Sequence, residues 1–151
     1  MAIQPVEFRP NVEQVQAALR RKVVQLKDRS VPNRQIAAVL DNWVQRNFRG
    51  EGSLVGGWTP FKAGGRRLRG GGIDTSAKLL QDTGRLRISV QPFWDRDIVG
   101  IGSDLAYAAH HEHGTTRIPR RRILPEEQDV IRPILATYNR YFQTVSREQM
   151  W

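Results

Sequence analysis

Three neighbouring stretches decide the order of the structural elements: LLQDTGRLRISV (residues 79–90), VGIGSDLAYAAHHEHG (residues 99–114) and TTRIPRRRIL (residues 115–124). They predict a short helix with a glycine stop, a β-hairpin, a second short helix with a glycine stop, and a basic strand. None of them supplies a convincing set of catalytic groups. The pattern therefore favours a compact module that docks against other proteins.

The hairpin is predicted from residues on either side of a polar turn. Residues 74–84 indicate a short helix closed near Gly84. Apolar and polar side chains then alternate over residues 85–90, as in a half-buried strand. Residues 94–97 supply the turn, and residues 98–102 form the expected returning strand.

A second helix and a third strand are expected after the hairpin. Asp104 is the predicted N-cap of a helix over residues 105–113, which Gly114 stops. Residues 118–124 are expected to form a basic strand. Pro119 confines that strand to an edge or a strand end, because proline has no N–H for a ladder hydrogen bond.

The N-terminal third reads as two amphipathic helices. The first is predicted to start at Asn11, and the second at Pro32 or Asn33 and to end at Gly50. Apolar residues recur at three- and four-residue steps in both. Because the link between them is short, an antiparallel helical hairpin is expected over residues 11–48.

The remaining segments complete a prediction of one domain over residues 1–151. Residues 50–73 are rich in glycine and arginine and indicate a flexible basic arm. Residues 74–143 carry the hairpin, the short helix, the edge strand and a C-terminal helix that starts near Pro125, and residues 144–151 form a tail. The expected fold class is α+β: a small antiparallel sheet packed against an N-terminal helical hairpin and a C-terminal helix, with long extended loop arms.

The amino-acid composition limits the classes of function that the protein can have. The 151 residues contain 24 Lys and Arg against 15 Asp and Glu, a formal charge of +9, which favours polyanions or acidic protein surfaces as partners. The chain has no cysteine, which excludes disulfides, thiolate catalysis and cysteine-based zinc sites. No stretch approaches the roughly 18 consecutive apolar residues of a membrane span.

One cluster invites a metal-site hypothesis. His110 and His113 share a helix face and Glu112 lies beside them, but the order is not HExxH, and all three histidines of the chain fall within these few positions. A structural role for His111 and its neighbours at the end of a helix is favoured. The glycines of residues 64–72 lack the Gly-Lys-Ser/Thr ending of a phosphate loop. We therefore expect no catalytic residue, metal or cofactor.

Arginines gather on the arm and on the basic strand, where paired contacts with carboxylate or phosphate are expected. Aromatic residues are not interleaved with them, so single-strand recognition by base stacking is poorly supported. Contact with the duplex DNA backbone stays open. The predicted interface residues are these arginines and two aromatic anchors: Trp58, Phe61, Arg66, Arg67, Arg69, Arg117, Arg120, Arg121 and Arg122.

A series of short motifs runs over about Phe48 to Leu135: Gly57-Trp58-x-Pro60, Leu79-Leu80-x-Asp82-Thr83-Gly84-Arg85-Leu86, Val99-Gly100-Ile101-Gly102, Tyr107-Ala108-x-x-His111-Glu112-x-Gly114 and Ile118-Pro119-x-Arg121. In this order they resemble the phage virion morphogenesis family, the tail-completion group of Mu-like and P2-like tailed phages. The resemblance gives structural roles to its motif residues: Asp82, Thr83, Gly84, Arg85, Leu86, Gly100, Gly102, Tyr107, His111, Glu112, Gly114 and Pro119.

The chain departs from that family pattern at a few positions. Glu112 stands where the family usually has glutamine, and Thr115 where it often has a second glycine. Arg122 and Ile123 replace a proline and an aromatic residue. These changes affect details of the interfaces.

The resemblance implies a non-enzymatic structural subunit of the neck, where head and tail join. Such tail completion and tail terminator proteins form rings, usually six-fold, so the expected partners are further copies, adjacent neck or tail-tube proteins and, non-specifically, passing genomic DNA. The protein would be assembled in the host cytoplasm and end in the virion. The alternatives are a basic, sequence-independent nucleic-acid-binding module and a metal hydrolase that uses the histidine cluster.

Overall fold

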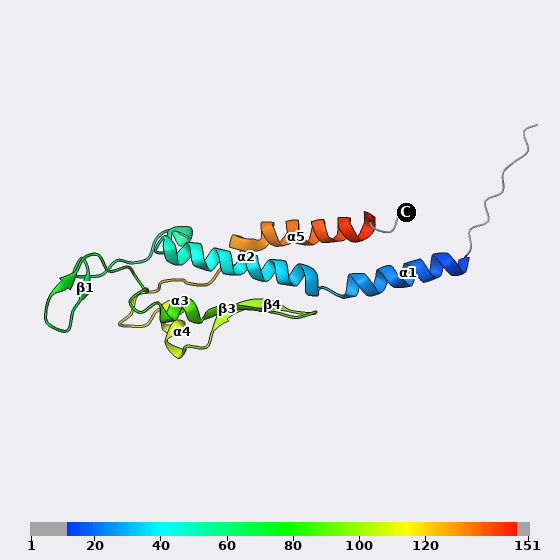
Figure 1. Cartoon of the computed structure of the whole chain (residues 1–151). Coiled ribbons are helices and arrows are strands. Elements are labelled where there is room, and N and C mark those ends of the chain that lie inside the picture. The colour runs from blue at the N-terminus through cyan, green and yellow to red at the C-terminus, as the bar shows by residue number, and fades with distance from the viewer. Residues whose placement is uncertain (1–11, 148–151) are drawn as a thin grey trace, which may run out of the picture.

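The computed structural model describes residues 12–147, which form an elongated molecule (Figure 1). Its helices and its two antiparallel two-stranded sheets confirm the α+β class. The elements, in chain order, are α1 (Val12–Lys27), α2 (Ser30–Arg49), the 3-10 turn η1 (Ser53–Val55), β1 (Arg66–Arg67), β2 (Ile73–Asp74), α3 (Arg85–Ser89), β3 (Val90–Trp94), β4 (Val99–Ser103), α4 (Ala106–His113) and α5 (Glu127–Arg147).

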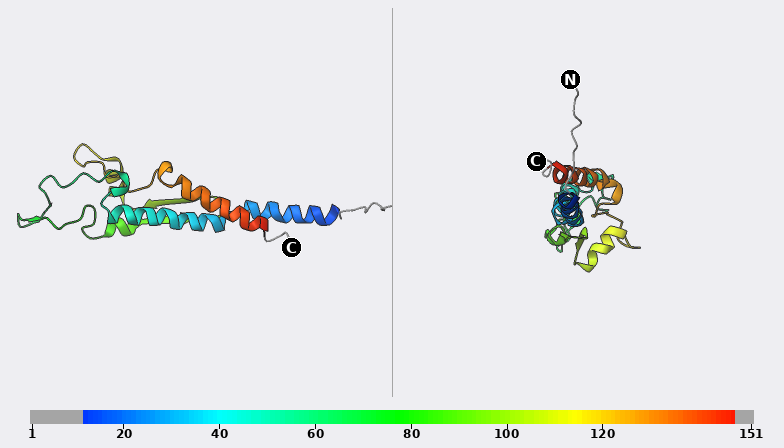
Figure 2. Two further views of the ribbon diagram at one scale, coloured as in Figure 1. Left: turned by 90° about the horizontal axis from the view of Figure 1, so that it is seen from above. Right: turned by 90° about the vertical axis from the view of Figure 1, so that its right-hand side faces the viewer.

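The expected N-terminal helical hairpin is not formed. Helix α1 continues almost in line with α2 and does not fold back on it (Figures 1 and 2). The link bends too little to reverse the chain, because Arg29 stays near helical dihedrals with φ −99° and ψ 8°. Asp28 accepts the N–H of Ser30 at 3.0 Å. Pro32 lies in the first turn of α2, where its missing N–H costs no helical bond.

Helix α2 is the centre of the packing. Helix α5 covers one side of it, and the β3–β4 hairpin lies on the other (Figure 1). One apolar cluster joins Ile36 and Leu40 of α2 to Val130 of α5. A second cluster continues along α2 toward its C-terminal end and contains Val44, Phe48, Trp58, Leu79, Leu86, Val90, Ala108 and Ile123.

The strand expected over residues 85–90 is replaced by α3, and β3 starts only at Val90. Leu86 and Val90 are buried, whereas Ile88 is 70% exposed. The buried pair is four residues apart, the spacing that a helical turn places on one face. The buried residues of this segment therefore follow the period of a helix, and the prediction of a strand from their alternation was wrong. The returning strand agrees with prediction: β4 pairs with β3, Phe93 opposite Gly100 and Gln91 opposite Gly102.

Two other expected elements are absent from the described residues. Residues 75–84 form turns and no helix, and Leu80 has φ 59°, which a helix does not admit. Residues 118–124 pair with no strand; side chains from other elements take up their backbone groups. Helix α4 ends before Gly114, as predicted, but Leu105 precedes it and the Ser103 hydroxyl, not Asp104, accepts the Leu105 N–H.

The segment of residues 50–74 leaves the body and returns. Trp58 enters the core, where its ring meets Phe48 edge-on. Gly52 has φ 86°, and a Cβ there would lie 2.3 Å from the Trp58 ring, so only glycine permits this close approach. Beyond it, the β1–β2 hairpin projects at the end of the molecule opposite α1 (Figure 1).

Candidate docking surfaces

Glu112 is the residue that holds the basic segment 117–124 against α4. Its carboxylate accepts the backbone N–H groups of Ile123 at 2.7 Å and Leu124 at 3.0 Å. The His111 carbonyl accepts the N–H of Arg121 at 2.7 Å. Sequence reasoning placed Glu112 in a motif but could not assign this role, because both partners lie in a loop that had been expected to be a strand.

Arg122 faces inward. Its side chain is 13% exposed and pairs with Glu126 at 3.0 Å and Asp129 at 2.9 Å. Its guanidinium also lies 5.9 Å from the centre of the Trp43 ring. Asn47 and Trp58 donate to its carbonyl. Arg122 therefore ties the basic segment to α2 and α5, so it is not an exposed contact residue in the single subunit, and neither is Trp58.

The other arginines of the basic segment are divided between internal bonds and solvent. Arg121 donates to the Thr59 carbonyl at 2.9 Å. Arg120 donates to the Glu112 carbonyl at 3.0 Å and pairs with Glu126 at 3.4 Å. Arg117 is exposed. Gly114 directly follows α4 and Pro119 lies within the basic segment, and the Cβ of any residue at Gly114 would press on the Arg120 backbone at 3.0 Å.

Most motif residues meet around one cavity of about 280 Å³. The residues of the DTGRL motif form one wall and Tyr107 and His111 of α4 another; the full lining is Phe61, Arg66, Lys78, Leu80, Asp82, Thr83, Gly84, Arg85, Leu86, Tyr107 and His111. The Tyr107 and His111 rings lie edge to face, 6.3 Å apart. Burial, helped by Arg121 and His110, lowers the pKa of His111, which favours its neutral form.

The histidine cluster does not form a metal centre in the part of the chain described: no group of three or more His, Asp or Glu side chains there could hold an ion. His110 and His113 are exposed on α4, and the Glu112 carboxylate is occupied by backbone N–H groups. The structure thus does not bring these side chains together as ligands. Helices over residues 12–147 also lack the length and hydrophobicity needed to cross a bilayer.

Residues 62–74 form the outer part of the expected basic arm, and the name arm is kept for them below. They carry a tip with basic and apolar side chains. Arg66 is held at its base by Asp82 and by Asp74 at 3.5 Å. Arg67 and Arg69 are exposed. The same tip exposes two large apolar side chains, Leu68 at 47% and Ile73 at 49%.

The outer face of the β3–β4 hairpin is also apolar and lacks a covering element. Phe93 and Ile98 are exposed there. The Phe93 ring lies over Gly100, where an added Cβ would come within 2.4 Å of it, whereas nothing lies within 4 Å of the Cβ position at Gly102. Gly100 thus makes room for the Phe93 ring on this sheet face, a role that spacing alone did not reveal.

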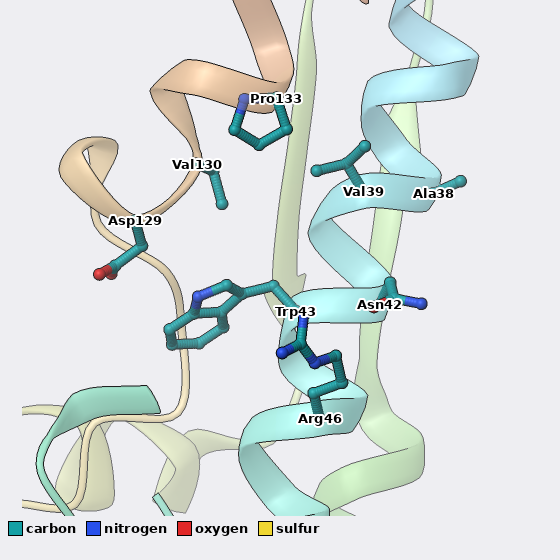
Figure 3. Close-up of a pocket in the computed structure, with 8 residues that line it drawn as sticks. All are labelled: Ala38, Val39, Asn42, Trp43, Arg46, Asp129, Val130 and Pro133. Atoms are coloured by element: carbon teal, nitrogen blue, oxygen red, sulfur yellow. The ribbon is translucent and has the colours of Figure 1, made fainter. Parts of the chain in front are cut away.

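A groove of about 390 Å³ runs between α2 and the start of α5 (Figure 3). Trp43 and Val39 of α2 face Val130 and Pro133 of α5 across it. Asp129 lies at its α5 rim, and the remaining lining residues are Ala38, Asn42 and Arg46. A mostly apolar groove of this size is within the roughly 300–1,000 Å³ of known binding sites.

Together these features define an α+β protein that exposes charged and apolar side chains on the arm and on the β3–β4 hairpin. The chain belongs to the phage virion morphogenesis family, whose family model matches residues 10–143. It is thus related to proteins that build the virion of a phage, a structural role. Comparisons with curated proteins and with solved structures gave no match.

Proposed function

We propose that this protein is a tail completion subunit that forms a ring at the head–tail junction of a tailed bacteriophage. The observation that carries the proposal is the family match over residues 10–143. The shape of the subunit supports it. An elongated chain with the arm at one end and α1 at the other presents unlike surfaces, which suit head-to-tail contacts in a ring.

The exposed apolar side chains also support assembly. Large apolar residues face solvent on the arm, on the β3–β4 hairpin and on α1 in the single subunit, among them Leu68, Ile73, Phe93, Trp94, Ile98, Leu19 and Val24. Grouped apolar patches of this kind mark interaction sites in proteins. Burial against neighbouring copies or neck proteins would remove these side chains from water, and this gain drives ring formation.

The basic segment has a positioning role in this proposal. Glu112 and Arg122 hold the loop of residues 117–124 in one conformation. That loop presents Arg117 on the surface, where it is available for acidic groups on an adjoining ring, whereas Arg120 is exposed but already pairs with Glu126. The subunit assembles in the host cytoplasm and remains in the virion.

The test is deletion of the gene followed by electron microscopy of the lysate. We expect separate DNA-filled heads and separate tails, with joined infectious particles restored by the wild-type gene supplied in trans. Normal joined particles in the deletion strain would overturn the proposal. Mass spectrometry of purified particles provides a second check, since the protein should be present at ring stoichiometry.

A second function, sequence-independent binding of nucleic acid, is favoured by the exposure of Arg67, Arg69 and Arg117. Such binding would weaken steeply as salt rises, because each phosphate contact releases counterions. A titration with duplex DNA at several salt concentrations tests it. A flat response, or affinity unchanged in an Arg67→Ala/Arg69→Ala variant, would remove this function.

A further inference from the structure

We propose that the arm of one copy docks into the α2–α5 groove of the next copy. This inference rests on the proposed ring and names the contact that builds it. Two surfaces must fit for such a contact: the tip of the arm, with Leu68 and Ile73, and the groove between Trp43 and Pro133. Neither is covered by another element within residues 12–147 of the same chain.

The apolar parts of the two surfaces match. Leu68 lies opposite Gly72, whose carbonyl accepts its N–H at 2.9 Å, and Ile73 lies opposite Arg67, so the two apolar side chains lie on opposite faces of the β1–β2 hairpin. A hairpin tip inserted edge-on would therefore present one apolar side chain to each wall of the groove. The groove of about 390 Å³ is walled by Val39, Trp43, Val130 and Pro133, and Figure 3 shows Val39 and Pro133 directed toward the space between the helices. Inserting the arm tip would bury apolar surface on both sides.

The charges on the arm tip and at the start of α5 favour the arm as the segment that occupies the groove. Arg67 and Arg69 are exposed at the tip, whereas Arg66 is neutralised by Asp74 and Asp82. At the start of α5, next to the groove, Glu126 and Asp129 already pair with Arg120 and Arg122, so Glu127 is the exposed carboxylate that remains available to the arginines of the arm. Opposite charges at the edge of an interface steer the two surfaces together.

The β3–β4 hairpin, which also exposes apolar side chains, fits the groove less well. The tip of the β3–β4 hairpin carries acids as well as a base: Asp95, Arg96 and Asp97. Two acids beside the acidic start of α5 would repel, a cost that the basic arm avoids. Arg46 on the α2 wall would repel the arginines of the arm, so these arginines approach from the α5 side.

The arrangement also explains why the contact joins different copies. The arm projects from the end of the molecule away from α5 (Figures 1 and 2), so its tip lies outside the body of its own subunit. A contact between unlike surfaces repeats from copy to copy and either closes into a ring or continues as a filament.

The test compares two altered chains with matched controls by analytical ultracentrifugation of the full chain. Arg67→Glu/Arg69→Glu alters the arm, and Arg20→Glu/Arg21→Glu makes the same charge change on the exposed face of α1. Pro133→Arg fills the groove, and Asn139→Arg adds the same charge elsewhere on α5. We expect the arm and groove variants to weaken self-association at least tenfold, about 1.4 kcal/mol, and the controls to change it less than threefold.

Mixing the two altered chains gives a sharper result. Each variant retains one intact surface, so an equimolar mixture should form one-to-one dimers that grow no further, while each variant alone stays monomeric. Circular dichroism spectra that match the wild type will show that the variants fold. Rings that persist in both variants would overturn the arm–groove contact and leave the ring intact. At roughly 1 mM protein, only contacts weaker than about −4 kcal/mol escape detection. A wild-type chain that stays monomeric at this concentration would contradict both the arm–groove contact and the ring.

A cross-link distinguishes docking between copies from docking within one copy. Since the chain has no cysteine, Leu68→Cys/Ala38→Cys introduces the only thiols, one on the arm and one on the groove. Oxidation should give a ladder of covalent oligomers that ends at the ring. An internal disulfide in a monomer, or no disulfide at all, would contradict the proposal.

Discussion

At the scale of single residues, several motif residues make contacts that hold the fold together. The spacing of the motifs in the sequence did not reveal these contacts. Glu112 satisfies two backbone N–H groups of a loop, Arg122 is buried among acids, and Gly100 provides space for Phe93. Each contact joins residues of different elements or loops, seven to twelve positions apart, and depends on how those segments fold against each other. Positions could therefore be predicted from the motifs, whereas their partners could not.

The role of Glu112 predicts a graded mutational effect. Glu112→Ala should lower the free energy of unfolding by about 2–3 kcal/mol, because the N–H groups of Ile123 and Leu124 lose their acceptor. Glu112→Gln should cost less than about 1 kcal/mol, since an amide oxygen can accept both bonds. Urea denaturation measures both values. Equal losses in the two variants would show that the carboxylate charge, not its position as an acceptor, matters.

The environment of His111 predicts a dependence of stability on pH. Burial lowers the pKa of His111 from its usual 6.5, so the unfolded chain takes up a proton at this position at higher pH than the folded chain. The contribution of neutral His111 to the free energy of unfolding is complete above about pH 6.5, and it declines as the pH falls through the lower pKa of the folded state. Urea denaturation between pH 7.5 and 5 should show this decline, and His111→Gln should reduce it. An unchanged decline in the variant would assign it to other groups.

At the scale of elements, the decisive packing is that of α2 between α5 and the β3–β4 hairpin. Buried Asn33 joins all three: its amide donates to the Asp95 carbonyl at 2.9 Å, and its oxygen accepts the Tyr138 hydroxyl at 2.7 Å. The sequence suggested Asn33 as the start of a helix. Its neighbours 62 and 105 residues away could be found only in the folded chain.

A double-mutant cycle tests this junction. Tyr138→Phe should lower the free energy of unfolding by about 1 kcal/mol and Asn33→Ala by about 2–3 kcal/mol, because the alanine also leaves the Asp95 carbonyl without its donor. The double variant should lose less than the sum, since the two residues share one hydrogen bond. Tyr107→Phe on α4 serves as the control. Strictly additive losses would mean that the Asn33–Tyr138 bond contributes nothing.

At the scale of the whole molecule, the core lies in the middle, and apolar side chains are exposed at both ends. Around α2 the side chains are buried, whereas α1 and the arm expose apolar residues. In the proposed ring, such a chain would gain stability from its centre and contacts with its neighbours from its ends. The division agrees with a protein that completes its packing in an assembly.

Two valines on neighbouring helices test that division. Val44 on α2 is 0% exposed and Val24 on α1 is 67% exposed. Val44→Ala should lower the free energy of unfolding by about 2 kcal/mol, through lost burial and a cavity. Val24→Ala should change it by less than about 0.5 kcal/mol. Guanidinium denaturation of dilute protein measures both; a large loss at Val24 would indicate that α1 is packed already in the free subunit.

The sequence by itself determined the helices α1, α2, α4 and α5, the strand β4, the α+β class and the family, because helical periodicity, glycine stops and motif order are local signals. Only the tertiary structure decided that α1 extends away from α2, that residues 85–89 turn as a helix, and that residues 118–124 stay a loop. Those outcomes depend on which side chains can be buried and on acceptors such as Glu112 that arrive from elsewhere in the chain. Such contacts have no local pattern from which they could be predicted.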